Sequence, residues 1–173
     1  NADSPPRPSR FTVDTRTTSR VRHDDYTLSG YDRGHMAPNY AIGSRYGASA
    51  QRETFFMSNI VPQKPVLNRR IWRRLEERIA KEYAMSFEEV WIITGPVYDE
   101  HKDVLKSGVE IPDAFFKIIV DEQSGKPRVM AFVIDQDVTG SERFSQFLAS
   151  VDFIELETGL DFLSGLEDGV EEK

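Results

Sequence analysis

The sequence predicts an α+β fold, with a mixed, largely antiparallel β-sheet core and one long amphipathic helix. Apolar, β-branched residues at 90–98 (VWIITGPVY) close with a Gly-Pro pair, which predicts a central strand. Two further apolar runs, at 114–121 and 128–135, flank the turn-forming SGKP and predict a β-hairpin. Between about 65 and 84 the apolar residues recur every four positions, which predicts a helix with one apolar face.

The remaining elements follow from local patterns in chain order. Residues 11–30 are polar and rich in turn formers, which predicts irregular surface structure. The segment ETFFMSNIVPQ, at 53–63, has a compact apolar centre followed by a proline, so we expect a buried strand that leads into a loop. Two short helices are expected around 141–148 and 150–157, with Gly159 as the stop signal of the second.

At 173 residues the chain is most simply one domain, long enough to bury a single core. We expect a flexible lead segment at 1–9, the folded domain at 10–166 and an acidic tail at 167–173. The absence of cysteine excludes disulfides and thiolate metal sites, and no apolar run approaches the roughly 20 residues of a membrane helix. The chain opens on Asn1, which favours the loss of an upstream targeting segment.

The net charge of −7 conceals an uneven distribution. Residues 1–83 carry 15 lysines and arginines against 9 aspartates and glutamates, a net +6, whereas residues 84–173 carry 7 against 20, a net −13. Except for Lys64 and Lys81, the early basic residues are all arginine, the side chain best suited to forked contacts with phosphate. A solvated, salt-bridged helix face produces the same pattern, so the charge by itself leaves both interpretations open.

The segment GYDRGHMAPN, at 30–39, surrounds one histidine with unusual neighbours. Its glycine and proline disfavour a long helix and predict a shaped loop or a strand end. The imidazole of His35 titrates near neutrality, so it could serve as a general base toward water, although a lone histidine is more often structural. His23 and His101 lie among charged residues, as is typical of an exposed surface.

A second group of candidate residues lies on the predicted helix. Asn68, Trp72 and Glu76 fall at i, i+4 and i+8, on the side of the apolar stripe. An asparagine near a helix start is usually a cap, and Glu76 would usually be a solvated partner for a nearby arginine. Polar groups at the edge of a core face need partners, however, and a hydrated metal ion is one such partner. Four arginines of this helix are expected to point away: Arg69, Arg70, Arg73 and Arg74.

Three motifs in this order, DRGHMAP, SNIVPQ and LN-x3-W-x2-LE, resemble those of the DNA/RNA non-specific endonucleases of the ββα-metal class, the family that includes mitochondrial endonuclease G. Further pieces of the pattern are F-x2-D at 11–14, DDY before the loop, TGP at 94–96 and IP-x2-FFK at 111–117. The resemblance extends over roughly positions 10–165. It implies that the strand-loop and helix motifs form one ββα-metal catalytic unit.

The resemblance also implies a role for each matching residue. His35 matches the general base, Asn68 the single protein ligand of a catalytic Mg²⁺, for which Mn²⁺ can substitute, and Glu76 the acid that orders the waters of the metal. Asn59 matches a polar residue close to the site, and Arg33 an arginine that holds the site or the phosphate. The family also has an upstream arginine that supports the transition state, and either Arg7 or Arg10 matches it. The charge distribution and the exposed side of the helical wheel add Arg70 and Arg74 as expected substrate-binding residues.

The implied activity is the Mg²⁺-dependent hydrolysis of DNA and RNA, single- and double-stranded, to 5′-phosphate and 3′-hydroxyl ends. The alternative is a catalytically inactive, nuclease-like domain that binds nucleic acid. An HNH-type nuclease would need more metal-ligand histidines near the motif. A protein inhibitor is a further candidate partner, no membrane association is expected, and the oligomeric state stays open. The opening of the chain and the toxicity of an unrestrained nuclease favour a secreted or periplasmic bacterial protein.

Overall fold

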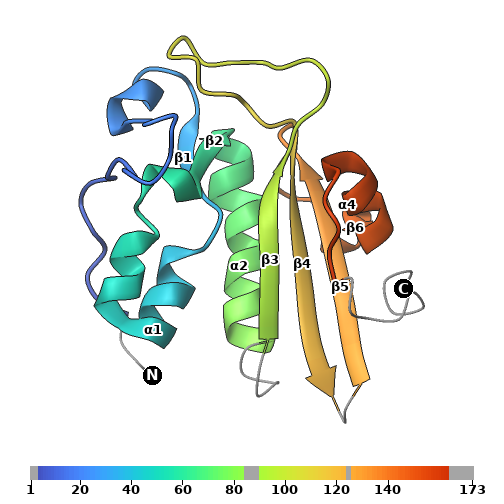
Figure 1. Ribbon diagram of the computed structural model, residues 1–173. Helices are drawn as coiled ribbons and strands as arrows, with labels where there is room; N and C mark the ends of the chain where they lie inside the picture. The colour runs from blue at the N-terminus through green and yellow to red at the C-terminus, as the bar shows by residue number, and fades with distance from the viewer. Residues whose placement is uncertain (1–3, 84–89, 124–125, 164–173) are drawn as a thin grey trace.

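The computed structural model describes residues 4–83, 90–123 and 126–163 of the chain (Figure 1). Within these residues β1 (Asp32–His35) pairs antiparallel with β2 (Ile60–Gln63). A second, fully antiparallel sheet has the order β3-β4-β5-β6. Its strands are β3 (Val90–Val97), β4 (Ala114–Gln123), β5 (Lys126–Asp135) and β6 (Leu148–Ala149). The predicted α+β class with a largely antiparallel sheet is therefore confirmed.

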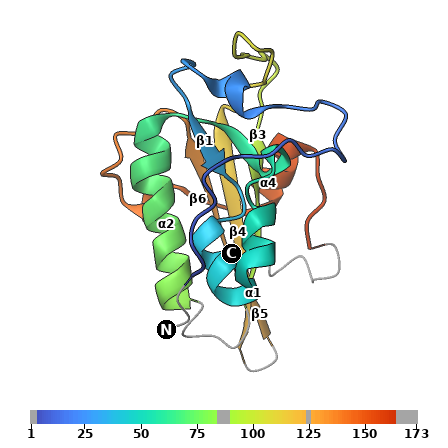
Figure 2. The ribbon, with the colours of Figure 1, turned by 90° about the vertical axis from the view of Figure 1, so that its left-hand side faces the viewer.

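Helices cover both faces of the larger sheet. The α-helices of the described residues are α1 (Asn39–Glu53), α2 (Arg73–Arg78) and α4 (Val151–Thr158). The chain enters α2 through a π-helical segment, Leu67–Trp72, and leaves it through another, Ile79–Tyr83. Shorter 3₁₀ turns are η1 (His23–Tyr26), η2 (Met57–Asn59) and η5 (Phe144–Gln146). We call the continuous helical stretch 67–83, made of α2 and its two π-helical ends, the α2 run. Figure 2 shows α1, β1 and the α2 run together on one side of the molecule, with the larger sheet behind them.

Strand β4 separates the two main cores because successive side chains of a strand point to opposite faces. Phe115 and Ile119 pack with the apolar residues of the α2 run, and the intervening Lys117 is buried on that same face. Phe116 and Ile118 pack on the other face with α4. The sheet is thus covered on both faces, which explains why its strands are almost continuously apolar in sequence.

The hairpin at 114–135 is confirmed, and its turn at 124–125 lies outside the described residues. The strand at 90–97 is also confirmed, but its predicted central position is wrong. Within the described part of the chain β3 pairs only with β4, and its Trp91 side chain is exposed. An apolar run indicates burial of a strand's faces and carries no information about how many neighbours the strand has.

Several local predictions need correction. Of the expected strand at 53–63 only Ile60–Gln63 forms a strand (β2), and the expected helix at 141–148 is a single 3₁₀ turn followed by β6. The second expected helix is confirmed as α4, where Ser150 Oγ accepts a hydrogen bond from Phe153 N (3.1 Å) and Gly159 ends the helix at φ 68°. Helix α1 was not predicted, and its helical geometry is broken at Gly47 (φ 82°).

The structure describes part of the predicted lead segment and none of the predicted acidic tail. The acidic tail at 167–173 lies outside the described residues, as do residues 1–3 of the lead segment. From Ser4 onward the lead contacts α1, since Gln51 Nε2 donates hydrogen bonds to Ser4 Oγ (3.4 Å) and Pro5 O (3.0 Å). None of the helices in the described part of the chain has the length and apolar character needed to cross a membrane.

Candidate active site

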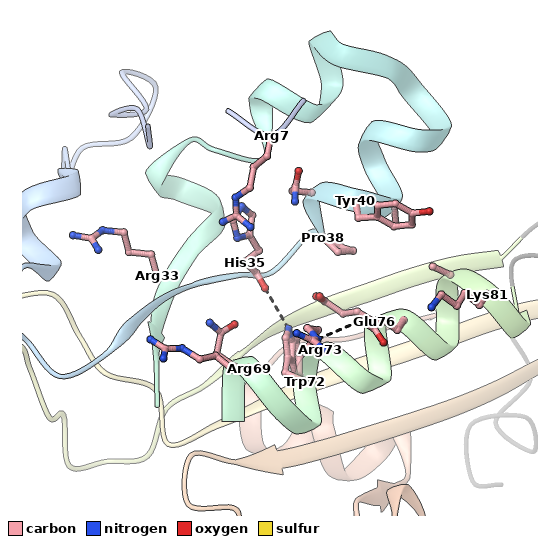
Figure 3. A pocket seen from close by; sticks show the side chains of 15 residues that line it. Arg7, Arg33, His35, Pro38, Tyr40, Arg69, Trp72, Arg73, Glu76 and Lys81 are labelled. Atoms are coloured by element: carbon pink, nitrogen blue, oxygen red, sulfur yellow. Dashed lines mark hydrogen bonds and ion pairs between the residues drawn. The ribbon is translucent and has the colours of Figure 1, made fainter. Parts of the chain in front are cut away.

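A pocket of about 590 Å³ opens between the end of β1, the first turn of α1 and one side of the α2 run (Figure 3). It brings together five residues predicted from the motifs: Arg7, Arg33, His35, Asn68 and Glu76. Four others predicted for the site are absent from its lining: Arg10, Asn59, Arg70 and Arg74. Its remaining charged lining residues are Arg69, Arg73, Glu77 and Lys81.

His35 ends strand β1 at the wall of the pocket. Its carbonyl accepts a hydrogen bond from Trp72 Nε1 (3.3 Å), which ties the strand to the α2 run (Figure 3). Its ring packs against Phe11 and Phe55, with centroids 5.5 and 4.9 Å away. The Nε2 atom is buried and has no hydrogen-bond partner among the described residues. Burial, aided by the positive charge of Arg7, lowers the pKa of His35 to about 4, so the imidazole is neutral at neutral pH.

Asn59 supports the loop that follows His35. Its Oδ1 accepts from Ala37 N (2.9 Å), and its Nδ2 donates to Ala37 O (3.0 Å) and Thr54 O (2.9 Å). These three bonds occupy the amide fully, so its side chain fixes the backbone after His35 and does not face the pocket. The motif comparison placed Asn59 near the site, and the structure makes it a positioning residue.

The glycine of DRGH has a steric explanation. A Cβ atom on Gly34 would overlap the side chain of Gln63, its neighbour on β2. Gln63 is fully buried, and neither of its amide atoms has a hydrogen-bond partner among the described residues. Glycine at position 34 therefore leaves the space that the buried Gln63 side chain occupies beside β1.

Asp32, the first residue of DRGH, orients the amide of Asn68. Asn68 Nδ2 donates to Asp32 Oδ2 (2.9 Å), and Arg69 forms a bidentate pair with the same carboxylate (2.7 and 2.8 Å). Burial opposes ionisation of Asp32, but the hydrogen bonds from Arg69 and Asn68 outweigh it and keep the pKa of this carboxyl below its ordinary value. With its nitrogen bound to Asp32, Asn68 directs its oxygen elsewhere, and it is not the helix cap that its position in sequence suggested. Sequence reasoning assigned Asp32 no role.

Glu76 lies deeper in the pocket, over a buried cation. Lys117 Nζ lies 3.6 Å from Glu76 Oε1 and 4.3 Å from the centroid of the Trp72 ring. Burial raises the pKa of the Glu76 carboxyl, and the Lys117 ammonium opposes that rise. Glu76 Oε1 is buried and makes no hydrogen bond within the described residues.

The arginines of the α2 run divide between two sides, and the predicted division is wrong in part. Arg69 and Arg73 line the pocket, although both were expected to point away. Arg74 donates to Gly140 O (3.1 Å) and lies over the Phe144 ring, and Arg70 packs against the same Gly140, so both face the 139–144 loop. The helical wheel assumed 3.6 residues per turn, whereas Leu67–Trp72 is π-helical, with i→i+5 bonds that change the direction of each side chain.

Two further arginines come from outside the helix. Arg33 lines the pocket while its guanidinium donates to His23 O (2.7 and 3.1 Å), so it is held at the rim. Arg7 lies over the Phe55 ring, 5.2 Å from its centroid, and points toward His35 (Figure 3). Between the two upstream candidates, the pocket therefore includes Arg7 and excludes Arg10.

The antiparallel pair of β1 and β2, followed by the α2 run, places a neutral histidine, an oriented amide and a carboxylate in one arginine-lined pocket. This arrangement defines a ββα domain of the nuclease class. The chain belongs to the DNA/RNA non-specific endonuclease family, whose profile matches residues 1–169.

Three curated relatives illustrate the similarity. The mitochondrial nuclease EXOG of Danio rerio is 34% identical over 162 residues, covering 85% of this chain and 46% of the relative. Human mitochondrial endonuclease G is 30% identical over 160 residues, covering 85% and 53%, and a nuclease of Serratia marcescens is 35% identical over 145 residues, covering 81% and 53%. The chain thus spans about half the length of these relatives.

A solved structure is also similar along nearly the whole chain. It is described as the crystal structure of an EndoG/EndoGI complex and the mechanism of EndoG inhibition. It superposes with a TM-score of 0.86 at 28% identity, covering 98% of this chain and 75% of that one. The relatives also correct the expected location. Those from zebrafish, human, mouse and fission yeast are mitochondrial nucleases, so the expectation of a secreted or periplasmic bacterial protein is wrong.

Proposed function

We propose that this domain is a Mg²⁺-dependent, sugar-non-specific endonuclease that cleaves DNA and RNA to 5′-phosphate and 3′-hydroxyl ends. The observation that carries the proposal is the meeting of His35, Asn68 and Glu76 in one arginine-lined pocket, in a chain of this family. These residues are 33 and 8 positions apart along the chain, so the fold itself brings them together.

His35 is the proposed general base. A base must be unprotonated and must have a free nitrogen, and both conditions are supported by the lowered pKa and by the unpartnered Nε2. We infer that His35 Nε2 takes the proton from a water that attacks the phosphorus. The hydrogen bond from Trp72 and the supports around Ala37 hold the imidazole in place for this transfer.

The residues of the pocket suit a hard, hydrated cation. Asn68 offers an amide oxygen that Asp32 directs, and Glu76 offers a buried carboxylate oxygen without a hydrogen bond in the described residues. Amide oxygen, carboxylate and water are the ligand types that Mg²⁺ prefers, and Mn²⁺ accepts the same set. When bound, the ion would stabilise charge on the phosphate and on the leaving oxygen. We infer that Asn68 holds it directly and that Glu76 orders the waters around it.

Nucleic acid is the proposed substrate because the rim supplies cations without a pattern that reads bases. Arg7, Arg33, Arg73 and Lys81 line the pocket and can contact phosphates, which carry no sequence information. Arg69 is paired with Asp32 and serves first to orient the site. The similar structure is described as an inhibited complex, which supports a protein inhibitor as a second class of partner here.

The decisive experiment compares the parent protein with His35→Ala on plasmid DNA and total RNA, with Mg²⁺ and with chelator. General-base catalysis typically contributes about 10²–10⁴-fold, so we expect the variant to lose at least about 10²-fold in rate while keeping its fold by circular dichroism. End labelling of the products should reveal 5′-phosphates. A parent protein that binds DNA and cleaves neither substrate would identify the catalytically inactive, nucleic-acid-binding alternative.

A further inference from the structure

A lysine is buried under the pocket, in the middle of the main sheet. Lys117 belongs to β4, is 1% exposed, and points to the same face as Phe115 and Ile119. Its neighbours on that face are apolar, and methionine or leucine would fill the position without taking a charge out of water. The aliphatic part of the lysine side chain can pack like these residues, but burying its ammonium is costly unless an opposite charge or a similar partner lies nearby.

The ammonium has two such partners, the Glu76 carboxylate and the Trp72 ring. Lys117 Nζ lies 3.6 Å from Glu76 Oε1, which is longer than a hydrogen bond, so the pair is held by charge. The same Nζ lies over the Trp72 ring, 4.3 Å from its centroid, a cation–π distance. Trp72 in turn donates to the carbonyl of His35. One cation of the sheet therefore contacts the carboxylate of the pocket and the indole that anchors the histidine.

We propose that Lys117 is a positioning residue of this nuclease: its ammonium keeps Glu76 ionised and directed into the pocket. Lys117 touches neither substrate nor reacting atoms and acts through Glu76. This inference rests on the proposed function for its catalytic consequence, whereas the ionisation of Glu76 can be tested without any substrate.

Other charges also face Glu76, and they do not replace Lys117. The groups of the pocket from the neighbouring elements are Arg7, Arg33, His35, Arg69, Arg73, Glu77 and Lys81. Arg33 is bound to His23 O, and Arg69 is paired with Asp32. Arg73 is paired with Glu77 (3.2 Å), and both side chains are solvent-exposed, so their field at Glu76 is screened. His35 is neutral near pH 7. Lys117 is the charge that lies within the low-dielectric interior beside Glu76. Burial lowers the pKa of its ammonium, and the negative charge of Glu76 opposes that fall.

The test is infrared spectroscopy in chelator at pH 7. Subtracting the spectrum of Glu76→Gln from that of the parent protein leaves the bands of the Glu76 carboxyl. We expect carboxylate bands in the parent. In the Lys117→Met background, the corresponding difference, Lys117→Met minus Lys117→Met/Glu76→Gln, should show the carbonyl band of a protonated acid. Carboxylate bands in the Lys117→Met pair, or an acid band in the parent, would overturn the proposal.

Kinetics and metal binding supply a second readout. Residues that orient a metal site typically contribute about 10–100-fold, so Lys117→Met should lower kcat by roughly that factor. Calorimetry should show weaker Mg²⁺ binding, and KM for a short duplex should change less than about threefold because Lys117 lies away from the phosphate rim. A variant with normal Mg²⁺ affinity and normal kcat would refute the role.

A matched control separates charge from packing. Ile119→Ala truncates a buried residue on the same face of β4 without changing charge. It should lower the melting temperature while leaving the Glu76 bands and the Mg²⁺ affinity unchanged. If Lys117→Met does not fold but Lys117→Met/Glu76→Gln does, the charge coupling is established through folding. If neither folds, Lys117 belongs to the packing of the core and the proposal fails.

If the Glu76 bands behave as expected and no nucleic acid is cleaved by the parent, the pairing stands and the proposed function fails. The two outcomes can therefore be told apart in one set of proteins.

Discussion

His35 is the residue at which burial has the clearest chemical consequence. Its pKa of about 4 lies below the ordinary 6.5, first because of burial and then because of Arg7. Between these two pH values the unfolded chain binds more protons than the folded one, so the free energy of unfolding should fall as the pH falls from 6.5 through about 4. Above pH 6.5 this contribution is fully present.

Urea unfolding of the parent and of His35→Gln, in chelator and across this pH range, measures that effect. The difference between the two proteins should grow toward higher pH and level off above 6.5. A pH-independent difference would show that the histidine titrates in the folded protein as it does in water.

Gly34 supports a second prediction at the scale of one residue. Gly34→Ala adds a methyl group where the buried Gln63 already lies, so we expect a loss of about 1–3 kcal/mol in stability through overpacking. Because Gly34 precedes His35, activity should fall further than stability alone explains. Shortening the neighbour should relieve the clash, so Gly34→Ala/Gln63→Ser should recover part of both. Thermal melts and plasmid cleavage of the four proteins form a double-mutant cycle, and strict additivity would argue against the contact.

At the scale of the element, the α2 run presents two adjacent arginines to opposite sides. Arg73 lines the pocket and Arg74 binds the 139–144 loop, so Arg73→Glu and Arg74→Glu make the same change in charge at different places. We expect Arg73→Glu to weaken binding of a short duplex about tenfold, near 1.4 kcal/mol, and Arg74→Glu to change it much less. Affinities measured in the His35→Ala background avoid cleavage. Equal losses would mean that substrate responds to the total charge of the helix.

The same helix shows which features of the site could be predicted from the sequence. Motif order and i+4 spacing located Asn68 and Glu76 correctly on one side, because π-helical geometry keeps residues four apart close together. The helical wheel predicted the wrong direction for the Arg69 and Arg73 side chains because no sequence pattern indicates a π-helical segment. Helix α1 escaped detection because Gly47 interrupts its geometry.

The residues that contact Asn68 and Glu76 could not be predicted from the sequence, for a different reason. Asp32 and Asn68 are 36 positions apart, and Glu76 and Lys117 lie on different elements. Such pairs depend on how the β1–β2 strand pair, the helix and the larger sheet pack in three dimensions, which a local sequence pattern does not encode. The resemblance supplied the residue types at the centre, and the fold supplied the contacts that orient them.

At the scale of the whole molecule, the sheet separates the side that carries the pocket from the side that carries α4. The α2 run covers one face of the sheet and α4 covers the other, within the half of the sequence that carries a net charge of −13 (Figure 1). Binding through phosphate contacts releases counterions, so affinity for a duplex should fall steeply with salt, and each lost contact should lower the slope by about 1.

The separation of the faces gives the last prediction. Glu157→Lys/Asp161→Lys reverses two exposed acidic residues, one in the last turn of α4 and one just after it, on the face of the sheet away from the pocket. Because exposed charges beyond about 10 Å are largely screened at 0.1 M salt, this double variant should leave the salt slope unchanged, whereas Arg73→Glu should lower it by about 1. The measurement is duplex affinity over a salt series in the His35→Ala background. A steeper slope for the α4 variant would mean that nucleic acid also reaches that face, and the pocket would then be only part of a larger binding surface.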